Sequence, residues 1–342
     1  MYPVKTQLTF NFIKEIGGEG ENSKTHLAHD PQLDAQIVVK AITKLSFNSH
    51  VEYFEESKML YSSRHPNIMV INYACEDDDH VYLSMPYCPK GSLNSIINKK
   101  FLTVREIIKY SLDFLSGLHY IHTKSLIHFD VKPTNIIIDN SNRAILTDFG
   151  LSKYSDIEGF ATPDKIYKKH YVPEVFISKD LTNQFDVYQA GLTLYRMCNG
   201  NEDFKSQTVG LTKEKIQSGV FPDRSRFLPH IPNSLSKCIK KALEVNPDKR
   251  YGTVLDLMNA ISAVTENLDW RYTKDEDKEQ WELDSEKTIK YLTLKVIKGK
   301  WAIRGQTYTK KNNKTSNITK YTSEHKNKED AYKQLVKNFK EI

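Results

Sequence analysis

The segment 127–150 constrains the chain more than any other part of the sequence. It reads IHFDVKPTNIIIDNSNRAILTDFG, so a strand-like apolar pattern separates two carboxylates, Asp130 and Asp148. Lys132 and Asn135 follow the first carboxylate at short range. This set supplies oxygen ligands for a metal ion, a base and a cation. Transfer of a phosphoryl group needs these groups, because the protein must hold metal against phosphate oxygens, balance developing charge and orient an incoming hydroxyl.

The segment resembles the catalytic loop and the metal-binding D-F-G of eukaryotic-type (Hanks-type) serine/threonine protein kinases. The resemblance implies that Asp130 orients the acceptor hydroxyl and accepts its proton, while Lys132 steadies the transferred phosphate. It also implies that Asn135 and Asp148 are ligands of Mg²⁺ in an ATP-dependent enzyme. An H-x-D or a D-F-G alone is a common loop sequence, so the prediction depends on both motifs and on further ones in the required order.

Upstream, residues 16–25 (IGGEGENSKT) lie between two apolar stretches, where the family has a glycine-rich hairpin over the nucleotide phosphates. Gly18 and Gly20 match the first two glycines of G-x-G-x-x-G. Ser23 replaces the third glycine, and Thr25 stands where a valine usually covers the adenine. Alone, a glycine-rich turn is more often just a hairpin, so its position carries the prediction.

The run 36–40 (QIVVK) is similar to the family's V-A-I-K strand. The resemblance places Val38 in the nucleotide site and brings Lys40 to the phosphates, paired with a glutamate from a helix. A lone lysine at a strand end would normally be solvated. We therefore expect a glutamate partner near the helix that precedes His65-Pro66-Asn67.

That helix is expected within 51–63, where Tyr53, Phe54, Leu60 and Tyr61 recur at helical spacing. Glu56 and Glu55 both compete to pair with the lysine, and their directions differ by about 100° around the helix. We prefer Glu56, because Leu60 falls one turn later on the same face and would pack inward.

The segment 81–93 resembles the last strand of the small lobe and the hinge that follows it. Pro86 departs from the family pattern, because proline removes a backbone N–H and stiffens the hinge. Adenine would bind backbone groups between Pro86 and Cys88. The resemblance implies four further nucleotide-site residues: the gatekeeper Met85, then Tyr87, Cys88 and Ile137.

The run 148–174 has the length of an activation segment, and it closes on Val172-Pro173-Glu174, which resembles A-P-E. The family pairs this glutamate with an arginine, here Arg250. Asp186 matches the start of the central buried helix, whose aspartate holds the catalytic loop. Small-molecule phosphotransferases share the H-x-D…N…D core but usually lack these parts. Their presence in this chain therefore favours a protein substrate.

Lys132 lies where serine/threonine kinases have lysine, so we expect Ser or Thr acceptors. Phe129 replaces the arginine of H-R-D and removes the cation that would bind a phosphorylated activation loop. We therefore expect constitutive activity or control by another surface. The segment 166–170 lacks the usual threonine that positions the peptide. Three lysines would favour an acidic substrate or would simply be solvated: Lys165, Lys168 and Lys169.

Length and composition suit one bilobal domain and a small addition, since the chain has 342 residues of which 39% are hydrophobic. We expect an α+β chain with a bilobal protein-kinase-like fold, a β-rich small lobe and a helical large lobe, followed by a small α/β module. The expected divisions are an N-lobe over 1–90, a C-lobe over 91–268, an acidic linker or helix over 269–286, and a basic module over 287–342.

No stretch is long and apolar enough to predict a membrane span, and the first residues lack the pattern of a secretory signal. The cysteines are scattered without C-x-x-C spacing, which argues against a zinc site or a disulfide framework. They are Cys75, Cys88, Cys198 and Cys238. We expect a cytoplasmic protein.

Basic residues are concentrated at the C-terminal end. The chain has 49 basic and 43 acidic residues; residues 287–342 hold 15 and 4, a net of +11, so the rest carries −5. Such asymmetry suggests a polyanionic partner. Alternating apolar residues around a turn at Gly299 predict a hairpin, and a later apolar stripe predicts a helix. These residues are Leu292, Leu294, Val296, Trp301 and Ile303 in the hairpin, and Ala331, Leu335, Val336 and Phe339 in the helix.

A small lysine-rich sheet with one helix can bind nucleic acid through phosphates, and Trp301, Tyr308 or Tyr321 could stack on bases. Such lysines are equally often only solubilising, and a hairpin tryptophan is more often core. The layout weakly resembles double-stranded-RNA-binding or W-G-R-type modules, through residues 301–305.

Three other functions stay open, and one of them is a nucleic-acid sensor whose C-terminal module controls the kinase. A small-molecule or nucleic-acid phosphotransferase would use the same core with a non-protein acceptor. A nucleic-acid-sensing scaffold would use the fold without catalysis, but the presence of Lys40, Asp130, Asn135 and Asp148 argues against that reading.

Overall fold

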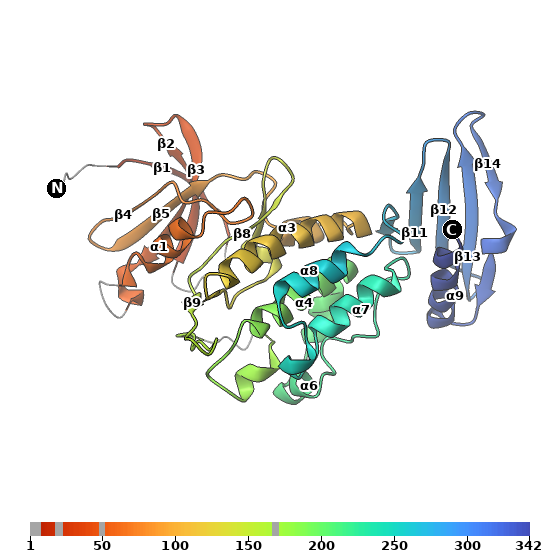
Figure 1. Cartoon of the computed structure of the whole chain (residues 1–342). Coiled ribbons are helices and arrows are strands. Elements are labelled where there is room, and N and C mark those ends of the chain that lie inside the picture. Colours follow the sequence, from red (N-terminus) through yellow and green to blue (C-terminus); the bar gives the residue numbers. More distant parts are fainter. Residues whose placement is uncertain (1–7, 18–22, 48–51, 166–170) are drawn as a thin grey trace.

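The computed structural model describes residues 8–17, 23–47, 52–165 and 171–342. A β-rich N-lobe lies at one end, a helical C-lobe lies in the middle, and a second β-sheet with one helix lies at the other end (Figure 1). The predicted fold class is therefore confirmed. None of the described helices combines the length and the apolar character that crossing a membrane requires.

The N-lobe is built on an antiparallel sheet in the order β1-β2-β3-β5-β4. In β3, alternation sends Ile37 and Val39 into a small outer core, and Val38 and Lys40 to the opposite face. This second face meets the C-lobe, because Lys40 bonds Asp148. The elements are β1 (Asn11–Glu15), β2 (Ser23–Asp30), β3 (Ala35–Thr43), α1 (Glu55–Ser62), β4 (Tyr73–Glu76) and β5 (His80–Pro86).

The C-lobe helices share one large core with residues from the N-lobe. Helix α3 starts at a capping box, in which Thr103 Oγ1 accepts from Glu106 N at 3.2 Å and the Glu106 carboxylate accepts from Thr103 N at 2.9 Å. Gly117 lets α3 approach the chain before β4, because a Cβ there would lie 2.5 Å from the Asn67 carbonyl oxygen. The helices are α2 (Leu93–Ile97), α3 (Val104–His122), α4 (Gln184–Asn199), α5 (Asn201–Thr208), α6 (Lys213–Gln217), α7 (Asn233–Ala242) and α8 (Val254–Ser262).

Two short strand pairs in this lobe carry the segment 127–150. Strand β6 (Leu126–Ile127) pairs with β9 (Lys153–Tyr154), and β7 (Ile136–Ile138) pairs with β8 (Ala144–Leu146). The segment therefore begins on β6, and the chain that follows it pairs with β6 again through β9, which brings its two carboxylates into one region.

The C-terminal module is a sheet in the order β10-β11-β12-β13-β14, with β15 also paired to β13. Lys298 and Gly299 both have positive φ, at 48° and 76°, which is the type I′ turn that a two-residue hairpin loop favours. Asn327 caps the helix, since its side chain accepts from Asp330 N at 2.8 Å. The elements are β10 (Arg271–Lys274), β11 (Lys278–Asp284), β12 (Thr288–Ile297), β13 (Lys300–Thr309), β14 (Lys314–Asn317), β15 (Ser323–His325) and α9 (Lys328–Glu341).

The predicted hairpin and closing helix are both present, but two details of the prediction were wrong. Residues 269–286 are not a linker or a helix, because β10 and β11 occupy most of this segment. Tyr272 pairs with Trp281 across these strands, so their aromatic rings enter the core of the module. Val336 lies outside the apolar stripe of α9, with 38% of its surface exposed.

The module is packed firmly against the C-lobe. Trp281 is fully buried, and its Nε1 donates to Nδ1 of the buried His230 at 3.0 Å. Phe101 meets Tyr272 edge to face, with ring centroids 4.6 Å apart. Phe339 of α9 contacts the same aromatic group. The first strands of the module therefore bind it to the C-lobe.

Candidate active site

Lys40 of β3 joins charged groups from the two lobes. Its Nζ donates to both Glu56 carboxylate oxygens, at 2.8 and 3.0 Å, and to Asp148 Oδ1 at 2.8 Å. Burial alone would lower the pKa of Lys40, but the carboxylates of Asp148 and Glu56 raise it above its ordinary value. Burial would raise the pKa of Asp148, and Lys40 instead holds it below its ordinary value. Both groups are therefore charged at neutral pH.

Helix α1 supplies the glutamate that we preferred. Glu56, not Glu55, pairs with Lys40, and Leu60 one turn later is buried with 3% exposure. The helix spans Glu55–Ser62, within the predicted range 51–63. Tyr61, expected on its apolar face, is instead 61% exposed and lies under the guanidinium of Arg64.

The catalytic-loop residues form a second charged group. Asp130 Oδ2 accepts from Asn135 Nδ2 at 2.8 Å and lies 3.0 Å from Lys132 Nζ. A short 3-10 turn at Pro133–Asn135 returns Asn135 toward Asp130. Thr147 N donates to Asn135 O at 3.0 Å, which ties this loop to the residue before Asp148.

Helix α4 holds the backbone of the catalytic loop. Asp186 is fully buried, and its carboxylate accepts from His128 N and Phe129 N, each at 2.8 Å. The same carboxylate contacts His122 Nε2 at 2.8 Å. Gln189, one turn later, accepts from Val131 N at 2.9 Å. These bonds fix the loop on both sides of Asp130.

Phe129, which replaces the arginine of H-R-D, is part of the core. Its side chain is 1% exposed and meets Phe185 edge to face, with centroids 5.2 Å apart. Phe129 and Asp148 both have φ near the left-handed region, at 64° each. This conformation is unfavourable for side chains other than glycine and persists where surrounding contacts enforce it, as the bonds from Asp186 do at Phe129.

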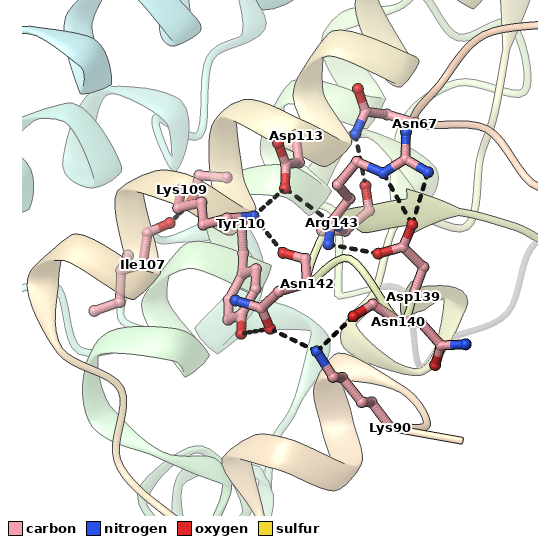
Figure 2. A network of polar contacts seen from close by, with 12 residues as sticks. Asn67, Lys90, Ile107, Lys109, Tyr110, Asp113, Asp139, Asn140, Asn142 and Arg143 are labelled. Carbon is pink, nitrogen blue, oxygen red and sulfur yellow. Dashed lines mark hydrogen bonds and ion pairs between the residues drawn. The ribbon is translucent and has the colours of Figure 1, made fainter. Parts of the chain in front are cut away.

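The turn between β7 and β8 is clamped onto α3 (Figure 2). Asp113 accepts from Ala144 N at 3.0 Å, and Tyr110 Oη donates to Asn142 Oδ1 at 3.0 Å. Lys109 also donates to the Asn142 carbonyl. Within the turn, Arg143 Nε donates to Asp139 at 2.9 Å. These contacts fix the position of β7 and β8 relative to α3. They therefore also position Ile137 and the residues that lead to Asp148.

Four of the predicted nucleotide-site residues meet in one apolar cluster. Met85 is its buried member, with Met69 and Ile145, and the other three pack against it half-buried: Val38, Cys88 and Ile137. Thr25 is directly opposite Lys40 in the β2–β3 pairing, so it lies on the same face of the sheet.

The other nucleotide-site predictions have different outcomes. Ser23 is the first residue of β2. Tyr87 is half-buried and is not a member of the apolar cluster. Gly18 and Gly20 lie outside the described residues.

The end of the activation segment is anchored as expected. Arg250, fully buried in its side chain, donates to both Glu174 carboxylate oxygens, at 2.6 and 2.7 Å. Such a bidentate pair restricts geometry strongly. Lys165 is exposed, while Lys168 and Lys169 lie outside the described residues.

The donor set fits the groups that the motifs imply. Asn135 and Asp148 provide the hard oxygen atoms that Mg²⁺ prefers, and Mg²⁺ commonly uses one or two carboxylates together with substrate phosphates. Lys40, whose pKa is raised by Asp148 and Glu56 against the effect of burial, provides a cation for phosphate oxygens at neutral pH. The apolar cluster around Met85 provides a surface for a flat aromatic base.

Sequence reasoning missed two structural supports of the site and one contact between the module and the C-lobe. Gln189 could have been noticed from its position one turn after Asp186 on α4. The clamp at 139–143 had a signal in its turn-forming residues, DNSNR. The contact of His230 with Trp281 had no signal in the sequence, because it depends on a pairing between distant parts of the chain.

Comparison with known proteins agrees with this geometry. The family model for the protein kinase domain matches residues 10–262. A probable serine/threonine-protein kinase of Dictyostelium discoideum is 32% identical over 246 residues, which cover 70% of this chain and 15% of that protein. Serine/threonine-protein kinase PrkC of Bacillus subtilis is 28% identical over 282 residues, 79% of this chain and 43% of the relative. The chain thus spans less than half the length of these relatives.

Proposed function

The chain belongs to the protein kinase family, and from this premise we propose that it transfers the γ-phosphate of ATP to serine or threonine side chains of proteins. One observation carries the proposal: Lys40, Glu56 and Asp148 form a single ion-paired group. A kinase site requires this lysine–glutamate pair together with the metal-binding aspartate.

Each residue of the site has a defined task in this proposal. The Asp130 carboxylate orients the acceptor hydroxyl and takes its proton as the new oxygen–phosphorus bond forms, while the bond between the γ-phosphorus and the β–γ bridging oxygen breaks and ADP leaves. Lys132, 3.0 Å from Asp130, stabilises negative charge on the phosphoryl group. Asn135 and Asp148 hold Mg²⁺, which neutralises charge on the phosphates when it is bound. Lys40 positions the phosphates.

A protein acceptor is supported by the anchoring of the activation segment. The buried Glu174–Arg250 pair holds the end of this segment against the C-lobe, and small-molecule phosphotransferases usually lack this apparatus. Lys132 supports serine or threonine as the acceptor. We further propose that phosphorylation of the activation loop does not switch the enzyme, since Phe129 is a buried ring where an arginine would bind the phosphate.

The acceptor class can be tested directly. The purified chain is incubated with radiolabelled ATP, Mg²⁺ and, separately, mixed proteins, sugars and RNA, with Asp130→Asn as the control. The proposal predicts label on protein serine or threonine that is absent in the control. Label on sugar or RNA alone would favour the phosphotransferase alternative, and no transfer to any acceptor would favour a scaffold.

A second part of the proposal concerns the C-terminal module. We propose that it binds an anionic partner, because residues 287–342 carry a net charge of +11. We place the protein in the cytoplasm, where its four free thiols would stay reduced.

A further inference from the structure

The C-terminal sheet has one covered face and one open face. Leu292 and Leu294 of β12 enter the core with Leu335 and Phe339 of α9. Side chains alternate along a strand, so Thr293 and its neighbours at two-residue steps point to the other face. That face is partly exposed and polar. The helix and the C-lobe contacts therefore occupy one side of the sheet, and the open face is left to solvent.

A hollow of about 360 Å³ lies on this open face. Lys295, Arg304, Gln306 and Asn317 line it together with three threonines, Thr293, Thr319 and Thr322. All of these side chains can donate hydrogen bonds and none of them is a carboxylate. The lining therefore carries two positive charges and many donors, which is a composition suited to an anion.

The two cations of the hollow differ in the partners that they already have. Arg304 is held in place, because its guanidinium donates to Glu324 at 3.0 Å and to the Ile303 carbonyl at 3.3 Å. Lys295 is exposed, and no carboxylate pairs with it in the described part of the chain. A bound anion would therefore form an ion pair with Lys295 without displacing a carboxylate, which it would have to share or displace at Arg304.

Aromatic rings continue the same face beyond the hollow. Tyr291 is paired with Gln306 across β12 and β13, and Tyr308 lies two residues further along β13. Both side chains are partly exposed. Trp301 and Tyr321, which we also considered as stacking residues, pack against the covered core, so Tyr291 and Tyr308 provide the accessible rings.

Lysines stand at both ends of the central hairpin. Lys298 and Lys300 flank the β12–β13 turn, while Lys310, Lys311 and Lys314 surround the β13–β14 turn. A ten-residue strand such as β13 extends about 30 Å. Cations thus recur over a length much greater than one phosphate group, and a phosphopeptide would use only the hollow. Tyr291 lies directly opposite Glu282 of β11, so the exposed rings and not neighbouring cations would contact the bases. Such rings suit unpaired bases, because recognition of bases by a sheet depends on stacking.

We propose that the open face of the C-terminal sheet binds single-stranded nucleic acid, with a backbone phosphate in the hollow at Lys295 and Arg304 and bases against Tyr291 and Tyr308. This inference rests on the proposed role of the module in binding an anionic partner. It names the partner class and the surface, and it is independent of the kinase reaction.

Binding is measured by fluorescence anisotropy with the full chain and a labelled 12-nucleotide oligothymidylate at low salt. Lys295→Glu should weaken binding at least about tenfold, since it reverses a charge at the phosphate. The matched control is Lys337→Glu, an exposed lysine of α9 on the covered side, which should change affinity by less than about twofold. Equal losses in the two variants would contradict the site, because net charge alone would then explain binding.

A milder variant tests the number of phosphate contacts. Lys295→Gln should reduce the slope of log affinity against log salt by about 0.7, the value for one contact on a single strand. An unchanged slope would contradict the contact. Thermal unfolding of each variant checks that the module remains folded.

The bases are tested with Tyr291→Ala and an abasic strand of the same length. The substitution should weaken binding of oligothymidylate by about tenfold and leave the abasic strand within about twofold. Equal effects on both strands would exclude stacking on this ring.

Polyglutamate and a phosphothreonine peptide serve as competitors, to separate this inference from the broader proposal. Neither should displace the oligonucleotide at equal charge concentration. Displacement by either would overturn the nucleic-acid inference and keep the anionic-partner proposal, whereas absence of binding to all three probes would overturn both.

Discussion

In the N-lobe, Lys40 lies 2.8 Å from Glu56 with 12% of each side chain exposed, whereas in the C-terminal module Lys310 lies 2.6 Å from Asp284 with 38 and 40% exposed. The two distances are alike, but water screens the second pair and hardly reaches the first. Removing either partner of a buried pair is therefore strongly destabilising, whereas an exposed pair contributes little to the stability of the fold. The kinase lobes therefore use buried charge to fix geometry, whereas the module leaves its charge in contact with water.

The largest expected effect is on catalysis, which should depend on the kinase lobes and not on the C-terminal module. Asp148→Ala should lower kcat/KM for phosphoryl transfer about a thousandfold, about 4 kcal/mol, because it removes a metal ligand and the partner of Lys40. It should also weaken Mg²⁺-dependent nucleotide binding. Lys295→Ala in the module should leave transfer to a short peptide within about twofold. Steady-state assays check both, and equal losses would show that the regions are not separate in function.

The second comparison concerns stability. Arg250→Met should lower the free energy of unfolding by about 3–5 kcal/mol, because it leaves the Glu174 carboxylate in a site where only 13% of its side chain is exposed. Lys310→Met should lower it by less than about 1 kcal/mol, since Asp284 remains solvated. Urea unfolding gives both values. A loss of similar size in the two variants would contradict the role given to burial.

The third test lies within α1 and uses two adjacent glutamates. Glu56→Gln should reduce kcat/KM roughly 10–100-fold, because the Lys40 ammonium loses a charged partner that positions it. Glu55→Gln should change it by less than about twofold, since that side chain lies on another face of the helix. Reversed effects would mean that the helix is rotated from the register described above.

The smallest expected effect is a pH dependence at the contact of the module with the C-lobe. Burial lowers the pKa of His230 to about 3, while an unfolded histidine has its ordinary value of 6.5. The unfolded state therefore binds a proton first, so stability is full above pH 6.5 and falls as pH drops toward 3. Between pH 7.5 and 5.5 His230 should account for a loss of about 1.4 kcal/mol.

His230→Gln provides the control for this pH effect. Glutamine can still accept from Trp281 Nε1 but does not titrate near neutral pH. Urea unfolding at the two pH values should therefore show a smaller decrease in the variant than in the native chain. An equal decrease would assign the pH dependence to other groups.

The arrangement of the candidate site could be predicted from the sequence, because the proposed chemistry needs particular residue types at particular spacings. Asp130, Asn135 and Asp148 stand in one short segment, and local strands bring them together. The choice of Glu56 over Glu55 followed from helical geometry and the position of Leu60. These predictions depended on local periodicity, which a sequence shows directly.

The C-terminal module was harder, because its first strands depend on contacts between distant residues. The acidic run at 275–279 suggested a linker, but it forms the turn and start of a hairpin whose Tyr272 and Trp281 pack on the C-lobe. Charge in a turn says little about the strands that flank it. Tyr321 was proposed as a stacking residue and is instead buried at 9% exposure.

The central claim is that the side chains converging around Lys40 and Asp130 transfer phosphate, and Asp130→Asn tests it most directly. This substitution keeps the shape of the side chain and its position between Lys132 and Asn135 but removes the base. The account predicts that the rate of a single turnover falls about 10²–10⁴-fold while the affinity for MgATP stays within about twofold. A variant that transfers phosphate as fast as the native chain would contradict the account.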